Sequence, residues 1–121
     1  MNIGPYTIDI FDTGDFALDG GAMFGVVPKT LWTKAYHPGD EFNRIDMTSR
    51  SLLIRGNGKN MLIDTGCGHK MSEKLESIYR VDYSRASIEH SLQSYGISSE
   101  DITDVILTHL HFDHVGGATK R

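Results

Sequence analysis

The segment around residues 105–117 constrains this chain more than any other. A short apolar run, Val105-Ile106-Leu107, is followed closely by His109, His111, Asp113 and His114. Such a run is typical of a short buried strand, so the polar cluster comes just after a strand end. Side chains two positions apart in extended backbone point to the same side, so His109 and His111 should face the same way. Two imidazoles on one side favour a borderline metal such as Zn²⁺.

The rest of this cluster suggests a second metal position. Asp113 and His114 are adjacent, so they diverge from the first histidine pair and can serve a second ion nearby. Gly116 and Gly117 would let the backbone pass close to the site because they carry no side chain. The alternative is a polar loop in which the histidines only form hydrogen bonds, but so many metal-ligand residue types in so few positions argue against it.

Composition and charge exclude several classes of function. The 121 residues fit one domain, and the net charge of -4 disfavours a nucleic-acid backbone as the main ligand. No apolar run approaches the ~20 residues that cross a membrane, and Met1 to Phe11 does not resemble a secretory signal. The single cysteine, Cys67, excludes an intrachain disulfide, so we expect a protein of the reducing cytoplasm.

The first half of the chain is predicted to be rich in strands. Residues 6–12 alternate apolar and polar side chains, as a half-buried strand does. Residues 13–39 are rich in Gly, Asp and Pro and are predicted to form a long irregular excursion. Residues 51–64 form two apolar runs around Asn57-Gly58, which predicts a hairpin with a type I′ turn.

The second half should contain two amphipathic helices before the strand at 105–107. Met71, Leu75 and Ile78 share one helical face. A second apolar face is formed by Ile88, Leu92 and Tyr95, with Gly96 as the helix stop and Ile97 placed to touch Leu92. Strands, helices and a further strand in this order predict an α/β or α+β domain with helices on one face of a sheet.

With these residues in place, the chain resembles the metallo-β-lactamase-fold metallohydrolases. The resemblance rests on the H-x-H-x-D-H run at His109, His111, Asp113 and His114, and on Ile63-Asp64-Thr65-Gly66 closing an upstream strand. Residues 6–117 match the order of elements in the first half of that family. The segment 20–32 is similar to the corresponding segment of the branch that contains lactonases and related ester or organophosphate hydrolases.

The resemblance implies a fold and a site. The fold would be an αββα sandwich of two sheets with helices outside, and residues 1–121 would be the N-terminal part of this single domain. His109 and His111 would bind a first Zn²⁺, Asp113 and His114 a second, with Fe or Mn as possible substitutes. Asp64 would support the site from beneath by orienting the ligands. A metal-bound hydroxide would attack an ester- or lactone-like small molecule, and Asp113 would pass a proton to the leaving group.

The resemblance also implies missing parts. The family's third histidine, bridging carboxylate and last histidine would all lie beyond Arg121, so we expect this chain to be the first half of a longer enzyme. Residues 1–121 alone should bind metal weakly and be inactive, since catalytic zinc normally has three protein ligands. An apolar sheet face, formed by some combination of Leu52, Ile54, Leu62, Val105 and Leu107, should be covered by the C-terminal half or by self-association.

Other candidate residues and functions remain open. Met23, Phe24 and Trp32 are candidates for a substrate pocket, whereas Cys67 is interpreted as an inert thiol. His37, His69 and His90 are interpreted as structural or exposed. Two alternative functions stand beside a dinuclear zinc hydrolase: a catalytically silent metal-binding or interaction module, and an iron-dependent oxygenase of the same fold. His111 disfavours the diiron electron-transfer branch, which usually has glutamate there.

Overall fold

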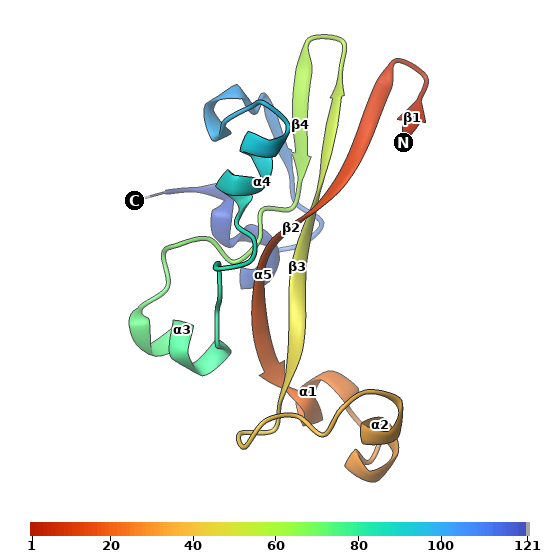
Figure 1. Ribbon diagram of the computed structural model, residues 1–121, viewed down its shortest axis with the longest axis vertical. Helices are drawn as coiled ribbons and strands as arrows, with labels where there is room; N and C mark the ends of the chain where they lie inside the picture. Colours follow the sequence, from red (N-terminus) through yellow and green to blue (C-terminus); the bar gives the residue numbers. More distant parts are fainter. Residues whose placement is uncertain (121) are drawn as a thin grey trace.

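A computed structural model describes residues 1–120 as a mixed α/β unit built on one sheet. The five strands lie in chain order: β1 (Asn2–Ile3), β2 (Tyr6–Asp19), β3 (Arg44–Gly56), β4 (Lys59–Ile63) and β5 (Asp104–Ile106). Neighbouring strands are antiparallel except β5, which runs parallel to β4. The helices are α1 (Gly20–Phe24), α2 (Lys29–Ala35), α3 (Glu73–Tyr79), α4 (Ile88–Ser94) and α5 (Phe112–Val115), with short 3₁₀ turns at Ser99–Asp101 and Gly116–Ala118. In Figure 1, β2 and β3 form a long ribbon, and the other elements lie along it or at its ends.

The predicted irregular excursion over residues 13–39 is wrong for most of its length. Strand β2 continues to Asp19, after a bulge between Asp12 and Gly14, and pairs with the first half of β3. The bulge accommodates an extra residue, Thr13, whose hydroxyl donates to the Ser49 hydroxyl at 2.9 Å. The chain then forms α1 and α2 at the far end of the ribbon (Figure 1). Pairing with β3 therefore overrides the polar, glycine-rich composition of this stretch.

The predicted hairpin is confirmed and extends further than expected. Strands β3 and β4 pair from Leu52 with Ile63 to Gly56 with Lys59. Asn57 and Gly58 both have left-handed backbone, with φ of 51° and 73°. Positive φ at both central residues is what a type I′ turn requires, and this turn matches the twist of the flanking strands.

The core lies on the face of the sheet that α4 covers. Its buried residues are Phe11, Leu53, Leu62 and Leu92, with Ile97 and Tyr95 packed against them. The Ser87 hydroxyl accepts from the His90 N–H at the start of α4, and Gly96 (φ 74°) follows its end. The Ile97 N–H donates back to the Leu92 carbonyl at 3.2 Å. The predicted helix, its glycine stop and the Ile97 contact are confirmed.

The opposite face of the sheet carries the exposed apolar side chains, and its composition corrects the prediction. Strand register places Ile10 beside Leu52, and Ile63 beside Leu52 and Ile106. Ile10 and Ile106 are 66% and 48% exposed. Leu62, predicted for this face, instead lies in the α4 core, because it pairs with Leu53 and not with Leu52. A shift of one residue in register exchanges the two faces, and composition alone does not fix it.

The predicted burial of the strand at 105–107 is also wrong. Strand β5 exists, but Val105 is 46% exposed, because β5 is the edge strand of this sheet. Helix α3 also exists, with the Ser72 hydroxyl accepting from the Leu75 N–H at its start, yet Leu75 and Ile78 are 42% and 48% exposed. Their apolar faces are present, but residues 1–120 cover them only in part.

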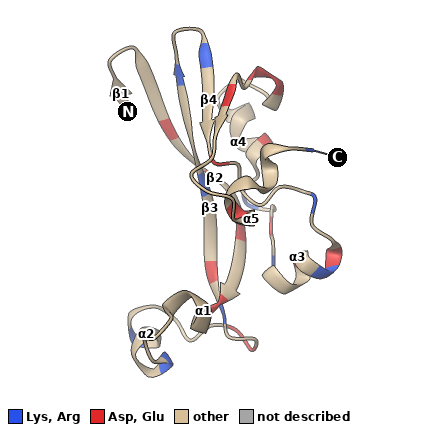
Figure 2. Ribbon diagram, turned by 180° about the vertical axis from the view of Figure 1, so that it is seen from behind, with Lys and Arg blue, Asp and Glu red and all other residues tan. Residues whose placement is uncertain are grey.

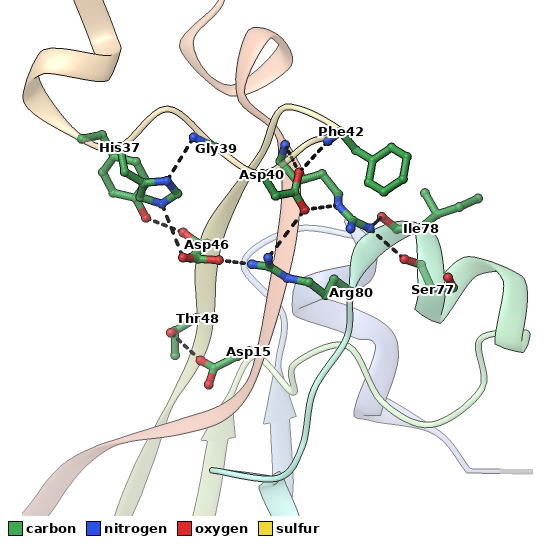
Figure 3. A network of polar contacts seen from close by, with 12 residues as sticks. Asp15, His37, Gly39, Asp40, Phe42, Asp46, Thr48, Ser77, Ile78 and Arg80 are labelled. Carbon is green, nitrogen blue, oxygen red and sulfur yellow. Dashed lines mark hydrogen bonds and ion pairs between the residues drawn. The ribbon is translucent and has the colours of Figure 1, made fainter.

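Charged side chains link the irregular segments to the ribbon. Asp40 accepts from the Arg44 Nε at 2.8 Å, and the same guanidinium donates to the carbonyls of Ser77 and Ile78 at the end of α3 (Figure 3). Arg80 pairs with Asp46 in the same network. Elsewhere, acidic and basic positions are distributed over strands and helices (Figure 2). None of the helices within residues 1–120 combines the length and apolar character that crossing a bilayer requires.

Candidate metal site

The site forms where β4 and β5 end side by side. The Asp64 N–H donates to the Ile106 carbonyl at 2.9 Å, which continues the parallel pairing by one residue beyond β4. The carboxyl ends of parallel neighbours meet at the same sheet edge, so Asp64 and Thr108 leave their strands together. This edge brings the D-T-G segment against the start of the histidine run, although they are about forty residues apart in sequence.

The Asp64 carboxylate is the most heavily bonded side chain of the site. Its Oδ1 accepts from the Thr108 N–H at 2.8 Å, and its Oδ2 accepts from the Thr108 hydroxyl at 2.7 Å and from His114 Nδ1 at 2.8 Å. Burial alone raises the pKa of Asp64, but the hydrogen bonds from His114 and Thr108 outweigh it, so the pKa lies below its ordinary value. Asp64 is therefore an ionised acceptor that holds two other groups in place.

Helix α5 positions the later part of the histidine run. His111 precedes the helix, and its carbonyl accepts from the N–H groups of His114 and Val115, each at 3.0 Å. His114 lies one turn on, where Nδ1 faces Asp64 and Nε2 lies 3.3 Å from Asp113 Oδ2. The short helix therefore places the Asp113 carboxylate and the free ring nitrogen of His114 next to each other.

The three imidazoles of the run form one cluster. The ring centroids of His109 and His111 are 4.7 Å apart, and those of His109 and His114 are 4.0 Å apart. Leu110, between the first two histidines, is 77% exposed and lies outside the cluster. The predicted ligand residues and Asp64 thus occupy one small volume, whereas their binding of metal stays a prediction.

Glycines allow two backbone segments to touch directly beneath this cluster. A Cβ on Gly116 would lie 1.8 Å from the Cys67 carbonyl oxygen, and one on Gly68 would lie 2.2 Å from the Gly116 carbonyl oxygen. The Thr65 N–H and hydroxyl both donate to the His114 carbonyl, at 2.7 and 2.9 Å. We name this contact between residues 65–68 and 114–117 the glycine seam. The glycines were expected to let backbone pass close to the site, and here they do so against residues 65–68.

The donor set fits a transition metal by its chemistry. Imidazole nitrogens with a carboxylate oxygen are the ligands that zinc and iron accept, and His114 already donates its other ring nitrogen to Asp64, as metal-ligating histidines commonly do. Among residues 1–120, however, no three His, Cys, Asp or Glu side chains are arranged so that they could hold one ion together. The identity of the metal, zinc, iron or manganese, stays a prediction.

The candidate pocket residues lie elsewhere in the molecule. Trp32 is buried against Gly20 and stacks on Phe24, with ring centroids 4.7 Å apart, whereas Met23 is 45% exposed. They belong to α1 and α2, away from α5 in Figure 1, so their role in a substrate pocket stays a prediction. A hollow of about 700 Å³ is lined in part by residues that alternate with or follow the predicted ligands, and not by the ligands themselves; its lining includes Met71, Leu75, Tyr79, Leu110, Phe112 and Val115.

The remaining candidates have structural surroundings. Burial raises the pKa of the Cys67 thiol to about 12, as expected of an unreactive cysteine. His69 Nε2 lies 3.5 Å from Glu89 Oε2, and His37 Nε2 lies 3.4 Å from Asp46 Oδ2. His90 is exposed on α4. Thr108 was not predicted as a site residue, and its one visible indication is a hydroxyl residue directly before the histidine run.

Comparison with known proteins relates this geometry to a family. The family model described as the metallo-beta-lactamase superfamily matches residues 44–120, which include β3, β4, β5 and the histidine run. A curated relative, N-acyl homoserine lactonase AiiB of Agrobacterium fabrum, is 24% identical over 115 residues, covering 88% of this chain and 41% of the lactonase.

Two solved structures are similar to this chain in fold and sequence. A probable metal-dependent hydrolase from Staphylococcus aureus is 39% identical with a TM-score of 0.85, covering 100% of this chain and 43% of that one. AidC, a dizinc quorum-quenching lactonase solved with a homoserine product, is 28% identical with a TM-score of 0.69, covering 100% of this chain and 38% of that one. The chain therefore spans about two fifths of the length of these relatives.

Proposed function

Because the chain belongs to the metallo-beta-lactamase superfamily, we propose that it carries part of the active site of a metal-dependent hydrolase that opens the lactone or ester bond of a small molecule. Its relatives include an N-acyl homoserine lactonase and a dizinc lactonase. The mixed α/β fold and the superfamily are shown, whereas the reaction and the substrate are our inference.

The observation that carries the proposal is the position of the His109 ring, whose centroid lies 4.7 Å from that of His111 and 4.0 Å from that of His114. Imidazole nitrogens gathered beside a carboxylate are ligands that zinc accepts. The ionised Asp64 holds His114 from the opposite side. The apolar hollow next to Leu110 and Phe112 offers space for the nonpolar part of a small substrate.

Each residue has a distinct part in the proposed site. His109 and His111 would hold one metal ion, and Asp113 and His114 the other. Bound zinc would supply a hydroxide at neutral pH and polarise the bond to be cleaved. Asp113, whose carboxylate lies 3.3 Å from His114 Nε2, would also pass a proton to the leaving group.

The proposed domain needs further ligands and a second apolar layer. The chain spans about two fifths of its relatives, so we propose that a segment equivalent to the other three fifths supplies the missing ligands. The same segment would cover the sheet face that carries Ile10, Leu52 and Ile106. In the isolated chain, self-association would cover that face instead.

A metal-dependence assay on the full-length protein tests the proposal. Hydrolysis of an N-acyl homoserine lactone and of a simple aryl ester is followed before EDTA treatment, after it, and after zinc is restored. We expect activity to disappear with EDTA, to return with zinc and to fall to background in His109→Ala/His111→Ala. His90→Ala, an exposed histidine on α4, is the matched control and should keep wild-type activity.

The same cluster can bind a metal without catalysing a reaction, so a catalytically silent metal-binding or interaction module is a second candidate function. If the full-length protein binds zinc but hydrolyses neither substrate, this second function replaces the first. A single bound iron would instead point to the oxygenase.

A further inference from the structure

The hydroxyl of Thr108 lies at the centre of the polar contacts beneath the histidine cluster. Its Oγ1 is 2.7 Å from Asp64 Oδ2, 3.0 Å from His109 Nδ1 and 3.5 Å from His114 Nδ1. The Thr108 N–H donates to the other oxygen of the same carboxylate at 2.8 Å. Main chain and side chain are thus both tied to Asp64, which fixes the direction in which the hydroxyl points.

The direction of each hydrogen bond follows from the donors available. A hydroxyl has one hydrogen, and an ionised carboxylate can only accept. If the Thr108 hydroxyl hydrogen pointed at His109, a lone pair of the hydroxyl oxygen would face the Asp64 carboxylate oxygen at 2.7 Å, and the two would repel each other. The hydroxyl therefore donates to Asp64 and accepts from His109 Nδ1, so His109 carries its hydrogen on Nδ1.

The same carboxylate fixes the tautomer of His114. His114 Nδ1 lies 2.8 Å from Asp64 Oδ2, so this nitrogen must also be the donor. In a neutral ring the nitrogen left without a hydrogen is then Nε2, which in His114 lies 3.3 Å from Asp113 Oδ2, the carboxylate proposed to bind the same metal ion. His114 contacts Asp64 directly, whereas His109 is linked to Asp64 through the Thr108 hydroxyl.

We propose that Thr108 is a positioning residue that relays the hydrogen-bonding of Asp64 to His109, so that one carboxylate presents Nε2 of both His109 and His114 for metal binding. This inference rests on the proposed function, in which the two histidines belong to two different metal positions. Without the relay, a neutral His109 would exchange between tautomers, and only one of them offers Nε2 as a ligand.

The test measures the tautomer directly. Long-range ¹H–¹⁵N correlation spectra of the metal-free, full-length protein are recorded well above the ordinary histidine pKa of about 6.5, so that the rings are neutral. Wild type and Thr108→Ser, which keeps the hydroxyl, should show His109 and His114 protonated at Nδ1. Thr108→Val, similar in shape but without the hydroxyl, should show a mixture of tautomers for His109 and an unchanged His114.

Zinc affinity provides a second measurement. Thr108→Val should weaken zinc binding roughly 10- to 100-fold, as the loss of a hydrogen-bond partner behind a ligand typically does, and Thr108→Ser should restore it. A wild-type His109 protonated at Nε2, or a Thr108→Val protein with wild-type His109 tautomer and zinc affinity, would overturn the proposal. The wild-type spectrum decides even if a variant misfolds, and neither measurement depends on hydrolysis, so failure of the proposed function is seen separately.

Discussion

Replacing Gly116 by alanine should open the glycine seam that supports the histidine cluster. The added Cβ would lie 1.8 Å from the Cys67 carbonyl oxygen, whereas real Cβ atoms essentially never come closer than 3.0 Å to such an atom. Gly116 has ordinary helical backbone, with φ of -57°, so alanine adds no backbone strain. The whole effect therefore comes from the collision between the two segments.

The size of the effect follows from the bonds that this separation breaks. Both hydrogen bonds from Thr65 to the His114 carbonyl, at 2.7 and 2.9 Å, cross the seam, as does the bond from the Gly117 N–H to the Gly66 carbonyl at 3.2 Å. At about 1 kcal/mol for each bond, Gly116→Ala should lower the free energy of unfolding by about 3 kcal/mol. It should also weaken zinc binding, because His114 moves with its carbonyl.

Denaturant unfolding of the full-length protein measures this change. Gly21→Ala in α1 is the matched control, because its nearest neighbour, Asp19 Oδ1 at 3.0 Å, is a side-chain atom and not backbone. That oxygen also caps α1 by accepting from the Ala22 N–H, but alanine is favoured over glycine in a helix by up to about 1 kcal/mol, so this control should be destabilised far less than Gly116→Ala. If Gly116→Ala unfolds at the wild-type denaturant concentration, direct backbone contact at the seam is refuted.

Three further predictions concern the core, the pH dependence and the thiol. Leu53 is fully buried in the α4 core, so Leu53→Ala should lower the free energy of unfolding by about 2–5 kcal/mol in the same denaturant assay. Hydrogen bonds from Arg85 lower the pKa of Asp12 and Asp15 below 3.8, so their stabilisation is present above about pH 4 and is lost as the pH falls through the lowered values; Arg85→Met should destabilise the protein at neutral pH, and the difference from wild type should vanish in acid. The raised pKa of Cys67, about 12, predicts that a thiol reagent at neutral pH labels it only on unfolding, which fast labelling of the native protein would contradict.

Local patterns were sufficient to predict the β3–β4 hairpin and the site segment. Asn57-Gly58 specifies its turn without help from the rest of the chain, and both residues have the expected positive φ. The histidine run also depends on local spacing, and its rings do lie together at the end of β5. The superfamily assigned from these residues is confirmed by the family match.

Features that depend on distant segments were not predictable in the same way. Residues 13–19 have no strand pattern of their own, and they become strand because β3 pairs with them. The face on which Leu62 lies depends on a register that composition does not encode. The proposed positioning role of Thr108 depends on β5 lying beside β4, because this pairing brings the Thr108 hydroxyl within 2.7 Å of Asp64.

The most direct test of the account is a crystal structure of the full-length protein with anomalous diffraction at the zinc edge. We expect metal bonded to the imidazole nitrogens of His109 and His111, with a second ion at Asp113 and His114, at ligand distances of about 2.0–2.2 Å. We also expect Nε2 as the bonded atom of His109 and His114, with their Nδ1 atoms facing Thr108 and Asp64. Zinc-loaded crystals without an anomalous peak at these residues, or with metal bound at other side chains, would contradict it.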